Sequence, residues 1–293
     1  MIDVNSSSIP LITTGDMTVS NHNQALGKWP NAPLALVLAQ VRYDPEVDTE
    51  YKEVAARLKA TLGEHFPAMK TVRPVTFVFG NVPVSAGESK TNEGEVGREL
   101  RSDDNRSALR LQDGVMTYTT SLYEDSLHFL ALWRSMLDCL CAAGAVKVQR
   151  LGLRYVDFII PTGDKVPEDY FIDGFGHSSN VFGEAAQTAF MSHEYYREGG
   201  AMRVQYGRGF AQPSLPPDLE GSVQVPPVLL GKYNKEQNGP SAVLDIDRWR
   251  NDNRRLQSEG IAKEFQFLRD DICQAFTRII TPEALAEWSG KQA

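Results

Sequence analysis

The chain has 293 residues, of which 42% are hydrophobic and 23% charged, a composition typical of soluble globular proteins. The formal net charge is −8 and no run of Lys or Arg stands out, so we do not expect nucleic-acid binding, which relies on basic side chains to neutralise phosphates. No apolar run reaches the roughly 18 residues of a membrane span, and the first residues do not resemble a signal peptide. We therefore expect a cytoplasmic protein without membrane contacts.

Residues 1–29 are rich in Ser, Asn and Thr and show little periodicity, which predicts a flexible arm. Residues 30–293 are predicted to form a single body with two associated halves, at about 30–161 and 162–293. The three cysteines are Cys139, Cys141 and Cys273. Their odd number and their spacing suit neither a disulfide framework nor a zinc site, so we expect reduced, packed thiols.

The first half is predicted from its hydrophobic periodicity. Val54, Leu58 and Leu62 recur at four-residue spacing, as on one face of a helix, whereas the run at 146–161 alternates as a strand does. In chain order we predict a strand at 31–45, a helix at 49–66, a strand at 73–80, a long loop at 81–106, a hairpin turning at Asp113-Gly114, a helix at 124–143 and a strand at 146–161.

The second half is less regular. Ile261, Phe265 and Leu268 begin a strongly amphipathic pattern, and Thr281-Pro282 is typical of a helix start. In chain order we predict a loop with short helical turns at 162–190, a hairpin turning at 198–200, an extended segment at 207–241 with an edge strand near 222–230, a strand at 241–249, a helix at 259–280 and a last short helix. The fold class predicted from both halves is α+β, with each half a mainly antiparallel sheet and long helices packed on one face.

Several landmarks of the sequence resemble one family. They are "NAPLALVLAQVRYDP" at 31–45, "VQRLGLRYVDFIIP" at 148–161, "LDID" at 244–247, and a final helix that carries Phe276. Over about residues 31–289 the chain resembles the sporadically distributed prokaryotic proteins that are named for their patchy occurrence. The resemblance implies a soluble, cytosolic bacterial protein, and the patchy occurrence suggests mobile or defence-associated genes. It implies no catalytic residue.

Asp245 and Asp247 form the main candidate site in "VLDIDRWR". On a strand the two carboxylates face one side, where they could hold Mg²⁺ or Ca²⁺. No matching acidic pair supplies further ligands, so we predict neither a metal nor a cofactor. We interpret the pair as part of a structural strand whose aspartates pair with arginines on neighbouring strands, for which Arg150 and Arg154 are natural partners.

Arginines in strand-like runs give the alternative. Guanidinium groups suit phosphate oxygens, so a concave face lined by these side chains would bind an anion despite the acidic total. The candidate ligand-binding residues are Arg42, Arg150, Arg154, Arg203, Arg248, Asp245 and Asp247, with Arg250 as a further member. For acid–base chemistry, His193-Glu194 is the best local pair, but neighbours on a strand point to opposite faces, and packing is the preferred interpretation.

No pattern of a serine, cysteine or phosphate-loop enzyme occurs, so we expect no catalytic site. The sequence favours a partner-binding protein, in which the arm at 1–29, the loop at 81–106 and the segment at 207–241 offer adaptable surfaces. The expected partner is another protein, such as a basic nuclease or toxin in a bacterial defence module. The alternative is a sensor or enzyme for a nucleotide or other phosphorylated ligand. The oligomeric state stays open.

Overall fold

A computed structural model describes residues 29–45, 51–72, 97–112, 114–144, 146–176, 186–209, 212–231, 239–255 and 257–290. Its strands are β1 (Leu34–Pro45), β2 (Ala68–Val72), β3 (Gly97–Arg101), β4 (Ser107–Gln112), β5 (Val115–Thr120), β6 (Val146–Ile159), β7 (Ala189–Arg197), β8 (Gly200–Gly209) and β9 (Ser241–Asn251). Its α-helices are α1 (Tyr51–Leu62), α2 (Ser126–Ala143), α3 (Pro227–Leu230), α4 (Ser258–Ile279) and α5 (Pro282–Ser289). Short 3₁₀ helices cover Pro167–Tyr170 and Pro217–Leu219.

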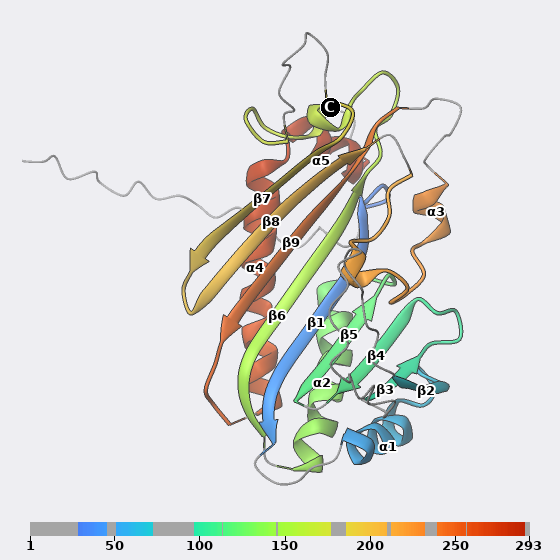
Figure 1. Ribbon diagram of the computed structural model, residues 1–293, viewed down its shortest axis with the longest axis vertical. Coiled ribbons are helices and arrows are strands. Elements are labelled where there is room, and N and C mark those ends of the chain that lie inside the picture. Colours follow the sequence, from blue (N-terminus) through green and yellow to red (C-terminus); the bar gives the residue numbers. More distant parts are fainter. Residues whose placement is uncertain are drawn as a thin grey trace, which may run out of the picture.

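The strands form one antiparallel sheet in the order β2-β3-β4-β5-β1-β6-β9-β8-β7 (Figure 1). The predicted α+β class is confirmed. The first half contributes β1 to β6 and the second half contributes β7 to β9, and the two halves meet where β6 pairs with β9. β1 lies between β5 and β6, so the first strand of the sheet joins two segments that follow it much later in the sequence.

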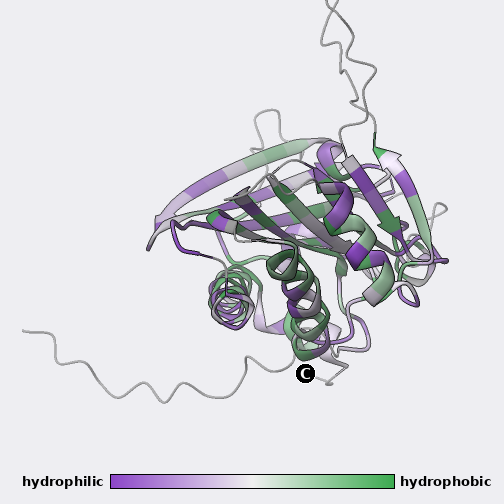
Figure 2. Ribbon diagram, turned by 90° about the horizontal axis from the view of Figure 1, so that it is seen from below, coloured by the Kyte–Doolittle hydropathy of each residue, from purple (hydrophilic) through white to green (hydrophobic). Residues whose placement is uncertain are grey.

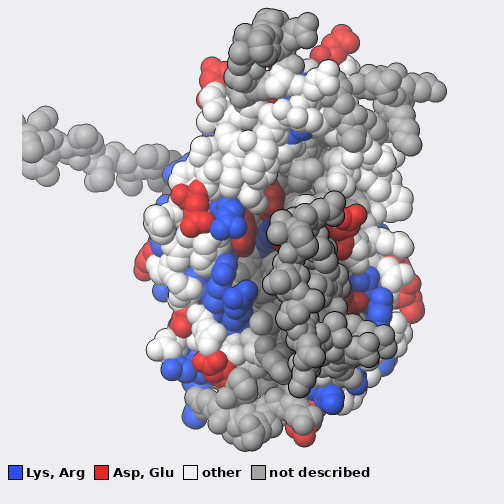
Figure 3. Space-filling model, in the orientation of Figure 1, with Lys and Arg blue, Asp and Glu red and all other residues white. Residues whose placement is uncertain are grey.

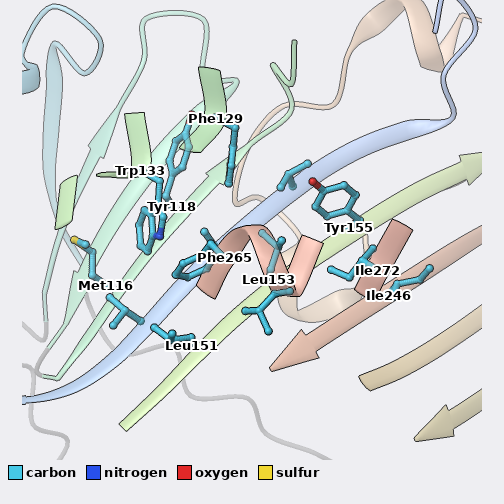
Figure 4. Packing of buried hydrophobic residues seen from close by; sticks show 14 of the residues in the cluster. Met116, Tyr118, Phe129, Trp133, Leu151, Leu153, Tyr155, Ile246, Phe265 and Ile272 are labelled. Carbon is cyan, nitrogen blue, oxygen red and sulfur yellow. The ribbon is translucent and has the colours of Figure 1, made fainter. Parts of the chain in front are cut away.

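The long helices cover one face of the sheet (Figure 2). The core on this helix-covered face includes Phe265 from α4, Trp133 from α2 and Tyr118 from β5 (Figure 4). The rings of Trp133 and Phe265 lie 5.4 Å apart, which joins the two helices over the sheet. Aromatic pairs of this kind stabilise a core beyond the area that they bury. Cys139 and Cys273 are buried, Cys141 is half-buried, and none of the three forms a disulfide.

The other face, which we call the open face, is covered over part of its area by residues 212–231, which we call the covering segment. Leu219 and Val223 of this segment pack on Leu36 and Phe158 of the sheet in a second, smaller core. The segment is also tied down by hydrogen bonds, among them Ser121 Oγ to the carbonyl of Gln224 at 2.6 Å. The segment packs on only part of the open face, and a cavity lies between it and the middle strands.

Several predicted elements differ from the structure. The predicted edge strand near 222–230 is wrong, because Pro226 and Pro227 begin the short helix α3 there, in agreement with the preference of proline for the first helical turn. The predicted loop at 81–106 contains β3, and β2 at Ala68–Val72 was not predicted. The predicted strand at 73–80, residues 81–96 of the loop and residues 1–28 of the arm lie outside the described residues.

Candidate ligand-binding site

The open face carries most of the predicted site because side chains alternate along a strand. Register pairs Arg42 of β1 with Arg150 of β6, and Arg154 of β6 with Asp247 of β9. On this face, Lys and Arg atoms gather beside acidic atoms over the β8 and β9 side of the sheet (Figure 3). The antiparallel sheet therefore brings together residues that are distant in the sequence, such as Arg42 and Asp247, which are 205 positions apart.

A cavity of about 380 Å³ lies between the open face and the covering segment. Its lining includes Arg42, Arg150, Arg154 and Asp247 of the predicted site, together with Arg110 and Glu99. This volume is in the range of small-molecule sites. Unlike most such sites, the cavity is lined largely by charged, amide and hydroxyl side chains, so a polar ligand would suit it better than an apolar one.

Arg154 connects the sheet to the covering segment. Its Nε donates to Asp245 Oδ1 at 2.8 Å and its Nη2 to Asp245 Oδ2 at 2.6 Å, while Nη1 and Nη2 donate to Asp218. Burial alone would lower the pKa of Arg154, but its hydrogen bonds to the two aspartates raise the pKa above its usual value. The predicted pairing of an aspartate in "VLDIDRWR" with an arginine of a neighbouring strand is therefore present.

Arg110 is likewise neutralised by a carboxylate. Its Nη2 donates to Glu99 Oε2 at 2.8 Å, and Arg101 Nε donates to Glu99 Oε1 at 2.5 Å. Burial would raise the pKa of Glu99, but the hydrogen bonds from the two arginines lower it. Arg110 and Arg154 therefore border the cavity as members of ion pairs.

Arg42 and Arg150 differ from these two arginines. Among the described residues, no carboxylate forms a salt bridge with either guanidinium group. Arg42 Nε contacts Gln40 Oε1 at 3.4 Å, and the guanidinium of Arg150 lies over the ring of Trp249 at 4.7 Å. Burial lowers the pKa of Arg150, Asp247 opposes this shift, and the charges of Arg42 and Arg203 lower the pKa further. Two cationic groups thus lie side by side on the floor of the cavity.

Gly152 lies at the middle of the cavity floor. Register places it between Gln40 of β1 and Trp249 of β9. A Cβ atom built on Gly152 would have no atom within 4 Å, so neither close packing nor a left-handed backbone explains the glycine. Glycine inside a strand often marks the close approach of a ligand or of another backbone. Gln40 Nε2 also donates to Thr117 Oγ1 at 3.1 Å, which fixes an amide beside the glycine.

Arg203 and Arg248 are placed outside the cavity. Arg203 lies on the open face, where it pairs with Glu194 at 2.8 Å and contacts the ring of Trp249 at 5.4 Å. Arg248 lies on the helix-covered face, fully buried, and donates to Asp271 of α4 at 2.8 Å. Arg250 follows the same alternation and pairs with Glu264 of α4. Arg248 and Arg250 therefore do not share a face with Arg150.

The two aspartates of the strand differ in their surroundings. Asp245 is buried and bound by Arg154, whereas Asp247 lines the cavity. Burial raises the pKa of Asp247; Arg154 and Arg150 oppose the shift, and Asp245 adds to it. Within the described ranges, no group of three or more His, Cys, Asp or Glu side chains is arranged to hold a metal ion. Asp247 and Arg150 interact electrostatically without a salt bridge between them among the described residues.

His193 and Glu194 lie on the edge strand β7 with their side chains on opposite faces of the sheet. His193 packs beside Tyr195, with 6.1 Å between ring centroids, while Glu194 pairs with Arg203. The pair therefore does not act as a joined acid and base in this structure.

Sequence reasoning missed Arg110, Glu99, Gln40 and Gly152 as parts of the cavity. The alternation of "SALRLQ" in β4 places Ala108, Arg110 and Gln112 on one face, and this signal was available. What the sequence does not show is that β5, with β4 on its far side, lies beside β1, because that pairing connects strands that are distant in the chain.

Comparisons with known proteins add little. No family model matches the chain, and a search of curated proteins found no match. A solved structure titled "Structure of Rolling Circle Replication Initiator Protein from Geobacillus stearothermophilus" aligns over 85% of this chain and 84% of that chain, at 10% identity and a TM-score of 0.30. A TM-score this low establishes neither a shared fold nor a shared function. None of the helices in the described ranges combines the length and apolar character needed to cross a membrane.

Proposed function

We propose that this protein binds a small phosphorylated ligand in the cavity, with Arg42 and Arg150 as the groups that contact the phosphate. The observation that carries the proposal is their side-by-side placement in register, without a carboxylate partner among the described residues. Two adjacent guanidinium groups repel each other, and an anion between them would remove that repulsion. The planar fork of each group matches two phosphate oxygens.

The remainder of the cavity suits the polar part of such a ligand. Gln40 and Thr117 offer an amide and a hydroxyl next to the space above Gly152. These groups can donate to and accept from the hydroxyls of a sugar or the edge of a base. A volume of about 380 Å³ admits a mononucleotide or sugar phosphate and is too small for a folded polymer.

The acidic total charge is compatible with this site. The chain carries a net charge of −8, but Arg110 and Arg154 already neutralise the carboxylates nearest to them, which leaves the two cations Arg42 and Arg150 beside one carboxylate, that of Asp247. Local charge rather than total charge decides whether an anion binds in a recess with low-dielectric walls. The protein partner that the sequence favours stays a prediction, because no contact on the open face specifies one.

The test is a binding measurement with a panel of probes. We would record thermal shift and calorimetry with pyrophosphate, AMP, ATP, ribose 5-phosphate and, as the uncharged comparison, adenosine. A ligand that binds only the folded state raises the melting temperature by mass action. We expect at least one phosphorylated probe to bind and adenosine to bind far more weakly.

Variants assign the binding to the two arginines. Arg42→Ala and Arg150→Ala should each weaken the best probe by about tenfold or more, since a hydrogen bond to a charged group contributes roughly 1.5–3 kcal/mol. Arg254→Ala is the matched control, because Arg254 is exposed and pairs with Asp252 and Glu264 away from the cavity. No response from any phosphorylated probe, or undiminished binding by the Arg42→Ala/Arg150→Ala double variant, would overturn the proposal.

A further inference from the structure

The second surface of interest is the edge of the sheet at β7, where the described residues add no strand beyond β7. This strand, Ala189–Arg197, pairs with β8 on one side and is the last strand of the sheet (Figure 1). It presents large apolar side chains to solvent, with Phe190 exposed by 71% and Tyr196 by 90%. Long, exposed, apolar edge strands are templates for pairing with another strand, and proteins normally protect them with charges, prolines or bulges.

The hairpin geometry shows which backbone groups of β7 point away from β8. Arg197 and Gly200 flank a two-residue turn and lie opposite each other, so they form a hydrogen-bonded pair, and bonded and non-bonded pairs alternate from there along β7. The N–H and C=O groups of the even-numbered residues therefore point away from β8. These are residues 190, 192, 194 and 196.

The side chains of β7 are complementary to a second copy of the same strand. An antiparallel pair with a two-fold axis at His193 places Phe190 opposite Tyr196 on one face and Met191 opposite Tyr195 on the other. Ser192 then lies opposite Glu194, and no like charges face each other directly. Aromatic cross-strand pairs of this kind stabilise a sheet, and the two-fold axis makes each pair occur twice.

The neighbouring registers are less favourable. Residues that lie opposite each other must have side chains on the same face of the sheet. The nearest alternative alignments therefore move one β7 strand by two residues along the other. One shift places Glu194 opposite the second copy's Glu194, and it leaves Phe190 without a partner on the strand. The opposite shift places Phe190 against Glu194 and leaves Tyr196 unpaired. Register is strongly specified when only one alignment pairs the apolar side chains.

We infer that two copies of this chain associate through β7, antiparallel about a two-fold axis at His193, to form a continuous sheet across both copies. The inference is independent of the ligand site, because no residue of β7 lines that cavity. Closed two-fold association through one surface is the commonest symmetry of soluble oligomers. The second copy satisfies the free backbone groups of β7 and covers Phe190 and Tyr196.

The first test is the mass in solution, by light scattering at micromolar concentration. We expect twice the chain mass of 32.6 kDa. Ser192→Pro removes an outward N–H at a position where an edge strand tolerates proline, and it should shift the protein to monomer. Ser192→Ala keeps that N–H and should leave the dimer unchanged. A monomeric unsubstituted chain at all accessible concentrations would sink the inference, as would a dimer that Ser192→Pro leaves intact while circular dichroism shows a folded protein.

Cross-linking tests the register directly. In this alignment the two His193 Cα atoms form a non-hydrogen-bonded pair, about 4.5 Å apart, which is within disulfide range. His193→Cys should therefore form a covalent dimer under mild oxidation, whereas Glu198→Cys in the turn should not. Phe190→Lys and Tyr196→Glu should each weaken the dimer by about tenfold, and the double variant should restore it through Lys–Glu pairs. Cross-linking by Glu198→Cys alone, or a double variant weaker than either single variant, would exclude this register.

Discussion

Gly152 has a role that its packing does not explain. The space above its Cα is free and the residue lines the cavity floor. Gly152→Val should therefore fold well, because a β-branched side chain suits a strand and glycine has more entropy to lose on folding, so the free energy of unfolding should rise by about 0.5–1 kcal/mol. The same side chain would occupy the ligand space, and we expect phosphate-probe affinity to fall at least about tenfold.

Gly209→Val is the matched control for Gly152→Val. Gly209 is also a strand glycine with no atom within 4 Å of a built Cβ, and it lies outside the cavity. Chemical denaturation and calorimetry on both variants separate stability from binding. If Gly152→Val bound the probe as the unsubstituted chain does, the space above this glycine would not be the ligand site.

Asp157 is a second residue whose placement has a measurable consequence. It is buried on the helix-covered face of β6, and burial together with the charge of Asp245 raises its pKa from 3.8 to about 8. Between those two pH values the unfolded chain has released the proton that the folded chain retains. The unfolded state binds fewer protons there, so this group lowers the free energy of unfolding as pH rises, by about 1.4 kcal/mol per pH unit.

Asp157→Asn should remove that dependence on pH. Urea unfolding of both proteins at pH 5, 6, 7 and 8 gives the unfolding free energy of the variant minus that of the unsubstituted chain. We expect this difference to increase steadily up to about pH 8 and to stay constant above it. The other carboxylates are present in both proteins, so their contributions to the pH dependence cancel when the two unfolding free energies are subtracted. A difference that does not change with pH would show that Asp157 is already ionised in the folded protein.

At the level of the elements, β9 shows how one strand serves two faces. Arg248 is fully buried and joins β9 to α4 through Asp271, whereas Arg203 on the adjacent β8 forms an exposed pair with Glu194. Arg248→Ala should lower the free energy of unfolding by about 1.5–3 kcal/mol, because it removes buried charged hydrogen bonds to Asp271 and to the carbonyl of Glu198, while Asp271 keeps its pair with Arg197. Arg203→Ala should lower it by less than about 1 kcal/mol.

Thermal and urea unfolding of the two arginine variants provide the comparison. The substitution is the same and the strands are neighbours. The two losses of unfolding free energy should therefore differ only because Arg248 is buried on the helix-covered face and Arg203 is exposed on the open face. Equal losses for both variants would mean that α4 is not anchored through Arg248 and Asp271. Ligand binding serves as a second readout, and we expect neither variant to abolish it, since neither residue lines the cavity.

Strand alternation explains which part of the site could be predicted. The period of two places Asp245 and Asp247 together, and Arg150 and Arg154 together, from sequence alone. The same period places Arg248 on the opposite face of β9 from Asp247, so the two side chains cannot line one cavity. Strand order was not predictable: Arg42 opposes Arg150 only because β1 pairs with β6, and no local pattern encodes a long-range pairing. The proline-rich region was misjudged because Pro226-Pro227 suits a helix start as well as a loop.

At the scale of the whole molecule, the covering segment couples the two halves of the chain. Asp218 of this segment is bound by Arg154 of the first half, which is also bound to Asp245 of the second. Asp218 has 62% of its side chain exposed, so Asp218→Asn should change the free energy of unfolding by less than about 1 kcal/mol. Its effect should instead be local, with faster amide exchange in the covering segment, because local opening needs less energy than global unfolding.

Hydrogen exchange of peptides from the covering segment, with and without a bound probe, measures this coupling. Glu220→Gln is the control, because it removes an exposed carboxylate from the same segment. In Asp218→Asn, Arg154 keeps its pair with Asp245 but loses the carboxylate that accepts from its Nη1, so Nη1 can donate to the ligand. The covering segment should open more often in the variant. A phosphorylated probe should therefore associate faster and also dissociate faster than it does with the unsubstituted chain. Unchanged exchange in the segment would show that its apolar contacts, Leu219 and Val223 on Leu36 and Phe158, hold it closed without the ion pair.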